Sequence, residues 1–130
     1  MKTLKVQIAK VGENYNAMID GIDYILASGD SISQIKDSIQ NEIALYKETS
    51  DPVPEELEGE LDFEFYLNVQ TFLDFYKDVF TKSGLERLSG INQKQLWHYG
   101  AGIRKPRKAQ RERLENALHK LGEELTFLHF

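Results

Sequence analysis

Amide and basic side chains gather in one short stretch near the end of the chain, and their chemistry suits the recognition of nucleic-acid bases. Gln93, Lys94 and Gln95 stand together, and His98 follows three positions later. A glutamine amide can form two hydrogen bonds with adenine N6 and N7, and a lysine ammonium can donate to guanine O6 and N7. These residue types in one run predict contacts with base edges in the major groove of DNA.

Positive side chains accompany this stretch and are suited to backbone phosphate. The predicted phosphate-binding residues are Lys82, Arg104, Lys105, Arg107 and Lys108. Such contacts position a protein on a duplex without specifying its sequence. A solvated, charged helix surface would use the same residues, so charge alone leaves both interpretations open.

The charge is divided unevenly along the 130 residues. Residues 1–80 contain 6 Lys or Arg and 16 Asp or Glu, a net charge of −10, whereas residues 81–130 contain 10 and 5, a net charge of +5; together they give the −5 of the chain. Such asymmetry predicts two modules with different partners. A basic module is typical of nucleic-acid binding.

The elements that must position the reading residues form a helix-turn-helix pattern. A short helix carries Leu85, Gly90 can take the left-handed conformation that ends it, and Asn92 is a good N-cap for the next helix. The apolar positions then bury one face of the second helix, through Leu96 and Tyr99. The alternative is an ordinary αα-hairpin, but the glycine turn, the polar helix start and the basic flank coincide here.

Two further helices are predicted around this pair. An aromatic stripe at spacings of three and four predicts a helix over residues 69–80. The last helix should bury a stripe and end at Gly122; the stripe is Leu114, Ala117, Leu118 and Leu121. The apolar residues 125–130 could add a strand, form a dimer contact or pack back onto their own domain. Trp97 could be partly buried or lie against a DNA backbone.

The first part of the chain predicts a sheet covered by one helix. Apolar residues alternate over residues 4–8, 15–19 and 22–26, and Asp20-Gly21 is a strong hairpin signal. Ser31 and Gln34 fit a capping box for a helix that ends near Lys47, and residues 61–67 alternate as a fourth strand. We therefore expect an α+β protein: a β-β-β-α-β antiparallel sheet module over residues 1–68, then an all-α helix-turn-helix module over residues 69–130.

Several chemistries are disfavoured by the composition. The chain has no cysteine, and its three histidines lie in no ligand spacing, so neither a metal site nor a cofactor is expected. The carboxylates near the strands alternate away from the apolar positions, which makes a metal-dependent nuclease the weakest alternative. No stretch resembles a targeting segment or a spanning helix, so we expect a cytoplasmic protein with no membrane partner and no enzymatic activity.

Two stretches resemble a known family. The sequence "GINQKQLWHYGAGIRKPRKAQRERLENALHKLGEEL" resembles the C-terminal helix-turn-helix of HicB-type antitoxins, which is similar to the Cro/repressor class. The sequence "MIDGIDYILASGDSISQIKDSI" is similar to the HicB N-terminal module, a partial RNase H-like fold. The chain departs from the family at Glu86, where a small residue is usual.

The resemblance implies an antitoxin of a type II toxin-antitoxin pair. Its N-terminal module would cover a small basic HicA-like toxin that cleaves RNA. Its C-terminal module would bind operator DNA as a homodimer or larger homo-oligomer and repress its own operon. By position, Gln93, Lys94, Gln95 and His98 would contact bases, while the phosphate role would fall on Arg104, Lys105 and Lys108. A stand-alone transcriptional regulator without a toxin is the alternative.

Overall fold

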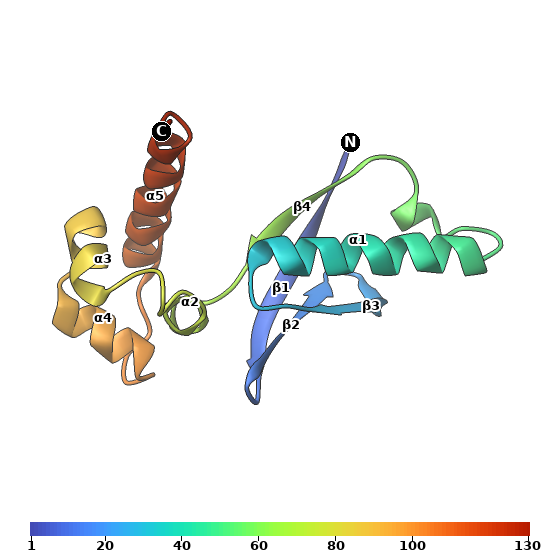
Figure 1. The fold of residues 1–130 in the computed structure, drawn as a ribbon. Coiled ribbons are helices and arrows are strands. Elements are labelled where there is room, and N and C mark those ends of the chain that lie inside the picture. Colours follow the sequence, from blue (N-terminus) through green and yellow to red (C-terminus); the bar gives the residue numbers. More distant parts are fainter. The chain divides into compact units, whose positions relative to one another are not determined.

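The chain folds into two compact units of different secondary structure. The computed structural model describes residues 1–130 and divides them into Met1–Leu67 and Asn68–Phe130. The first unit contains the sheet and one long helix, and the second contains only helices (Figure 1). The α+β class and the predicted order of strands and helices are confirmed.

The sheet of the first unit has four strands in the order β3-β2-β1-β4. The strands are β1 (Lys2–Val11), β2 (Asn14–Ile19), β3 (Ile22–Ser28) and β4 (Leu61–Tyr66). The first three form the predicted antiparallel meander, but β4 pairs parallel to β1. The prediction of a wholly antiparallel sheet is therefore wrong. The reason is the connection: a helix separates β3 from β4, and such a crossover lets a strand return in the parallel direction.

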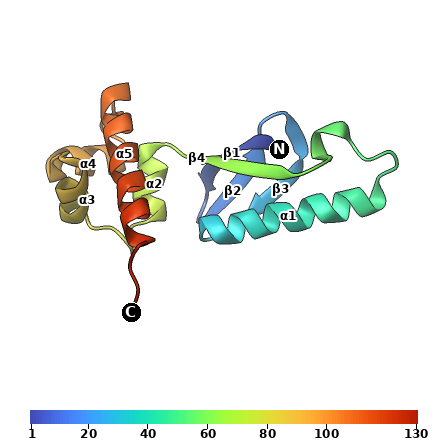
Figure 2. The ribbon, with the colours of Figure 1, turned by 90° about the horizontal axis from the view of Figure 1, so that it is seen from above.

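One face of this sheet is buried and the other is open. Residues of the first three strands, such as Val6, Ala17 and Ile25, lie in the core, and alternate residues of β4 are half-buried. Helix α1 (Ile32–Thr49) covers that face (Figure 2) and adds Ile35 and Ile39 to the core. The apolar alternation predicted from the sequence therefore selects the face on which the helix lies.

The start of α1 differs slightly from the predicted capping box. Ser31 Oγ accepts a hydrogen bond from the backbone N–H of Gln34 at 3.1 Å, as expected. The Gln34 side chain accepts at 2.8 Å from the N–H of Asp30 and not from that of Ser31. At its other end α1 reaches Thr49, two residues beyond the expected end. The following loop contains a short 3-10 helix, η1 (Glu55–Leu57), whose Leu57 is fully buried.

A tyrosine–glutamate hydrogen bond fastens this loop to the sheet. Tyr24 of β3 donates to Glu56 Oε1 at 2.7 Å, and its ring stacks on Tyr46 of α1 at a centroid distance of 4.6 Å. Partial burial, followed by the hydrogen bond to Glu56, raises the pKa of Tyr24 to about 12. The same bond lowers the pKa of Glu56. Both shifts favour the neutral phenol beside the ionised carboxylate.

The second unit consists of four helices. They are α2 (Val69–Phe75), α3 (Lys82–Ser89), α4 (Gln93–Gly100) and α5 (Lys108–Leu125). The prediction of one helix over residues 69–80 is wrong, because α2 ends at Phe75 and turns follow. The rings of Tyr76 and Phe80 still pack against Phe72, at 5.2 and 6.1 Å. Aromatic residues at spacings of three and four can therefore pack together in a compact turn as well as in a helix.

Helix α5 is longer than predicted and less buried. It continues through Gly122 to Leu125, and of the predicted stripe only Leu114 is buried, whereas Ala117, Leu118 and Leu121 are half-buried. Beyond the helix, Phe127 and Leu128 are 78% and 57% exposed and form no strand. Two expectations for residues 125–130, a strand and packing onto their own unit, are therefore wrong.

None of the helices has the length and apolar character needed to cross a membrane.

Candidate nucleic-acid interface

The turn between α3 and α4 is fixed by a buried serine and a left-handed glycine. Gly90 has φ of 77°, a conformation that favours glycine, and its N–H donates to the Glu86 carbonyl at 2.7 Å. Ser89 Oγ donates to the Leu85 carbonyl at 2.6 Å and accepts from the Ile91 N–H at 3.1 Å. Since Ile91 is also buried, the direction in which the chain enters α4 is determined.

Two side chains cap the first turn of α4. Asn92 Oδ1 accepts from the Gln95 N–H at 2.9 Å, which confirms the predicted N-cap. Glu86 Oε2 accepts from the Gln93 N–H at 2.7 Å. A carboxylate at a helix N-terminus is favourable because the free N–H groups carry partial positive charge. Glu86 therefore has a structural task, namely holding the start of α4.

Helix α4 presents one buried and one open face. Leu96 and Tyr99 are 0% and 5% exposed and anchor the helix, as predicted. Gln93, Lys94 and Trp97 are exposed. Trp97 follows Lys94 by three residues and Gln93 by four, so it lies next to both of them on the helix surface.

The four predicted base-reading residues have different surroundings. Gln93 and Lys94 are exposed, whereas Gln95 and His98 are half-buried. Gln95 Oε1 accepts from Gln110 Nε2 of α5 at 3.1 Å, which commits its amide to the unit's own packing. The His98 ring meets Trp97 edge-on at 5.6 Å. The structure thus brings Gln93 and Lys94 together on the open face and turns Gln95 toward α5.

Trp97 is the residue whose place the sequence left open. It is 54% exposed, and it follows Lys94 by three residues and Gln93 by four. That spacing was the signal that could have assigned it to the open face. Its position beside Leu96 in the chain had suggested partial burial. Consecutive helical residues face different directions, however, so the burial of Leu96 favours an exposed Trp97.

All five predicted phosphate-binding cations are exposed. Arg104, Lys105 and Arg107 line an open hollow of about 550 Å³, together with Gln95, Tyr99 and Gln110. Lys108 begins α5 and lies 3.8 Å from Glu112 in an exposed ion pair. Lys82 lies apart from these residues at the start of α3, near Trp97. The cations therefore stand on more than one side of α4.

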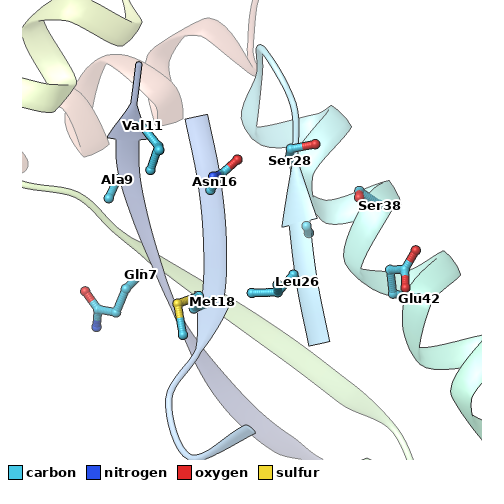
Figure 3. Close-up of a pocket in the computed structure, with 10 residues that line it drawn as sticks. Gln7, Ala9, Val11, Asn16, Met18, Leu26, Ser28, Ser38 and Glu42 are labelled. Carbon is cyan, nitrogen blue, oxygen red and sulfur yellow. The ribbon is translucent and has the colours of Figure 1, made fainter. Parts of the chain in front are cut away.

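The first unit offers a shallow pocket instead of a cluster of catalytic groups. Its hollow of about 480 Å³ lies at the open sheet face and the flank of α1, and its only charged residue is Glu42 (Figure 3). Met18 and Leu26 give the hollow an apolar floor and are themselves exposed. The carboxylates of Asp20, in the turn after β2, and of Asp62, in β4, are exposed, and no group of three or more His, Cys, Asp or Glu residues is placed to hold a metal ion.

Comparison with protein-family models, curated proteins and solved structures finds no match for this chain. A function must therefore be argued from the residues and geometry of the two units.

Proposed function

We propose that the second unit binds duplex DNA in a sequence-specific manner and that the protein is a non-enzymatic transcriptional regulator acting in the cytoplasm. The observation that carries the proposal is the open face of α4. Gln93 and Lys94 are exposed at the start of a short helix that buried Leu96 and Tyr99 hold in place. Polar side chains on a rigid helix of this length suit the major groove, whose base edges differ for each base pair.

The contacts divide by chemistry. Gln93 is suited to adenine and Lys94 to guanine, while the exposed cations Lys82, Arg104, Lys105, Arg107 and Lys108 neutralise phosphate. Neutralised phosphates release counterions, so affinity should fall steeply as salt rises. Removing one phosphate-binding cation should reduce the slope of log affinity against log salt by about 1.

Selection from a pool of random duplexes tests this proposal directly. We expect one preferred sequence with two-fold symmetry and half-sites about 34–36 Å apart, because two copies of a helix-turn-helix read the same face of the duplex. Equal affinity for all duplexes at moderate salt would refute specific recognition. Lys120→Ala, on α5 and outside the predicted interface, is the matched control for the cation variants.

We further propose that the first unit binds a basic protein and that the whole chain is an antitoxin. Residues 1–67 contain 5 Lys or Arg and 14 Asp or Glu, a net charge of −9, whereas residues 68–130 contain 11 and 7, a net charge of +4. Complementary charge favours a basic partner for the first unit and steers its approach. The resemblance to HicB-type antitoxins supports a small RNA-cleaving toxin as that partner.

Co-expression with the product of the adjacent reading frame distinguishes the antitoxin from a stand-alone regulator. Joint purification, loss of the complex at high salt and relief of toxicity support the antitoxin. Failure of the neighbouring product to bind favours the stand-alone regulator, in which the sheet unit has another task.

A further inference from the structure

Trp97 stands out among the residues of α4 because it is large, apolar and open to water. It is the only tryptophan of the chain and is 54% exposed, whereas the other large apolar side chains of α4, Leu96 and Tyr99, are buried. About half of its surface is therefore open to water, while the rest packs against neighbouring residues such as His98. An exposed indole on a face that otherwise carries Gln93 and Lys94 has a surface free for a partner.

The surroundings of Trp97 place it between two kinds of predicted DNA contact. Along α4 it shares the open face with Gln93 and Lys94. On its other side is an open groove of about 310 Å³, lined by Leu73, Asp74, Lys77, Lys82, Trp97, Gly100 and Ala101. Lys82 is one of the predicted phosphate-binding cations, and Lys77 lies 4.0 Å from Asp74. A duplex that meets both Gln93 and Lys82 would pass over the indole.

The major groove offers one apolar group that an indole could cover. Each thymine presents its 5-methyl group there, and apolar side chains recognise it by contact. Gln93 and Lys94 have only polar tips to offer, so Trp97 supplies the apolar contact that this face otherwise lacks.

We propose that Trp97 is a specificity-determining residue that recognises thymine by covering its 5-methyl group in the major groove. The thymine lies next to the base pairs read by Gln93 and Lys94. This inference rests on the proposed DNA-binding function and adds to it a base preference and an apolar contact.

The first experiment uses the tryptophan as its own probe. The full chain is titrated with the duplex obtained by selection, and acrylamide quenching of the indole fluorescence is measured. We expect the bound protein to be quenched at least about twofold less, since the duplex would cover the exposed ring. Unchanged quenching at saturation would overturn the inference.

The second experiment removes only the methyl group. Each thymine of the selected duplex is replaced in turn by deoxyuridine. At one thymine per half-site we expect wild-type affinity to fall about three- to fivefold, the loss that corresponds to one buried methyl group. Trp97→Ala should bind the thymine duplex more weakly and be indifferent to deoxyuridine at that position.

Control variants separate recognition from folding. Trp97→Phe should keep part of the sensitivity to deoxyuridine, and Val79→Ala, which shortens an exposed apolar side chain outside α4, should keep all of it. Trp97→Ala should still unfold cooperatively, because Leu96 and Tyr99, which anchor α4, are unchanged. Sensitivity to deoxyuridine retained in Trp97→Ala would overturn the inference.

The two proposals fail in different ways. If selection yields no preferred duplex, specific DNA binding itself fails. If a preferred duplex is found but no thymine responds to deoxyuridine, DNA binding stands and the role of Trp97 is refuted.

Discussion

At the scale of single residues, Gln93 and Gln95 have the same side chain and different surroundings. Gln93 is exposed, whereas Gln95 is half-buried and bonded to Gln110. We expect Gln93→Ala to lose about 1–3 kcal/mol of discrimination at one base pair. We expect Gln95→Ala to keep its base preference and to lose about 0.5–1.5 kcal/mol of unfolding free energy, since a half-buried hydrogen bond disappears.

Binding to the selected duplex and its single-base variants, combined with urea unfolding, measures both effects. If Gln95→Ala relaxes base specificity and Gln93→Ala does not, the base-contacting role belongs to Gln95. Its hydrogen bond with Gln110 would then break when DNA binds.

The Tyr24–Glu56 pair should give the first unit a characteristic response to alkali. In the folded protein the pKa of Tyr24 is about 12, above its ordinary value of 10.0. The stability that this shift contributes is fully present below pH 10.0 and is lost as the pH rises through about 12. Tyr24→Phe should abolish this part of the alkaline loss, as measured by unfolding at increasing pH.

The carboxylate of the pair behaves in the opposite sense. The hydrogen bond from Tyr24 lowers the pKa of Glu56, so its contribution is present above the ordinary pKa and is lost as the pH falls through the lowered value. Tyr24→Phe should raise the pKa of Glu56 toward 4.5, as followed by NMR titration. If the pKa of Glu56 is the same in the variant as in the wild type, the hydrogen bond from Tyr24 is absent in solution.

Local patterns predicted the anchoring residues of α4 and not the partners of its polar ones. Leu96, Tyr99 and the cap Asn92 follow from helical spacing and from the preferences of helix ends, which are properties of neighbouring residues. The bond between Gln95 and Gln110 joins residues fifteen positions apart. No periodicity reports such a contact, because it depends on how α5 meets α4.

At the scale of elements, Ser89 should be the most sensitive position of the turn between α3 and α4. Its hydroxyl is the partner of the Ile91 N–H in a buried place. Ser89→Ala leaves that N–H unsatisfied, and we expect a loss of about 1–3 kcal/mol in unfolding free energy. Chemical denaturation measures it, with Ser83→Ala on the exposed side of the same helix as control. Equal stability of the two variants would mean that the turn rearranges.

The errors made for whole elements arise where one local pattern is compatible with more than one structure. Strand β4 alternates as predicted, but alternation carries no information about parallel or antiparallel pairing, which the crossover through α1 determines. Helix α2 stops at Phe75 although the aromatic spacing continues, because turns can satisfy the same ring contacts. Glycine at position 122 did not end α5, because an exposed helical glycine weakens a helix by only about 1 kcal/mol.

At the scale of the whole molecule, the charge of each unit limits its partners. A unit of net charge −9 is repelled by a duplex, so we expect the proposed phosphate contacts to come from the second unit, whose charge is +4. The amino-acid composition predicted this division well, because charge is additive along the chain. The open face of α4 could not be predicted in the same way, since it depends on which residues the packing leaves exposed.

The exposed apolar residues after α5 should decide whether the protein binds DNA as a dimer. Phe127 is 78% exposed, Phe130 is fully exposed, and Leu125 and Leu128 are also open. Two phenylalanines bury about 150–250 Å² each when covered, a large part of the ~800 Å² per partner that a stable interface needs. We therefore expect the wild type to sediment as a dimer and the double variant Phe127→Asp, Phe130→Asp to sediment as a monomer.

That double variant should lose cooperative binding to the two-fold site, while its affinity for one half-site stays unchanged. Val79→Asp, at an exposed apolar position elsewhere, should change neither the oligomeric state nor the cooperative binding. A dimer that survives the double substitution would place self-association on another surface.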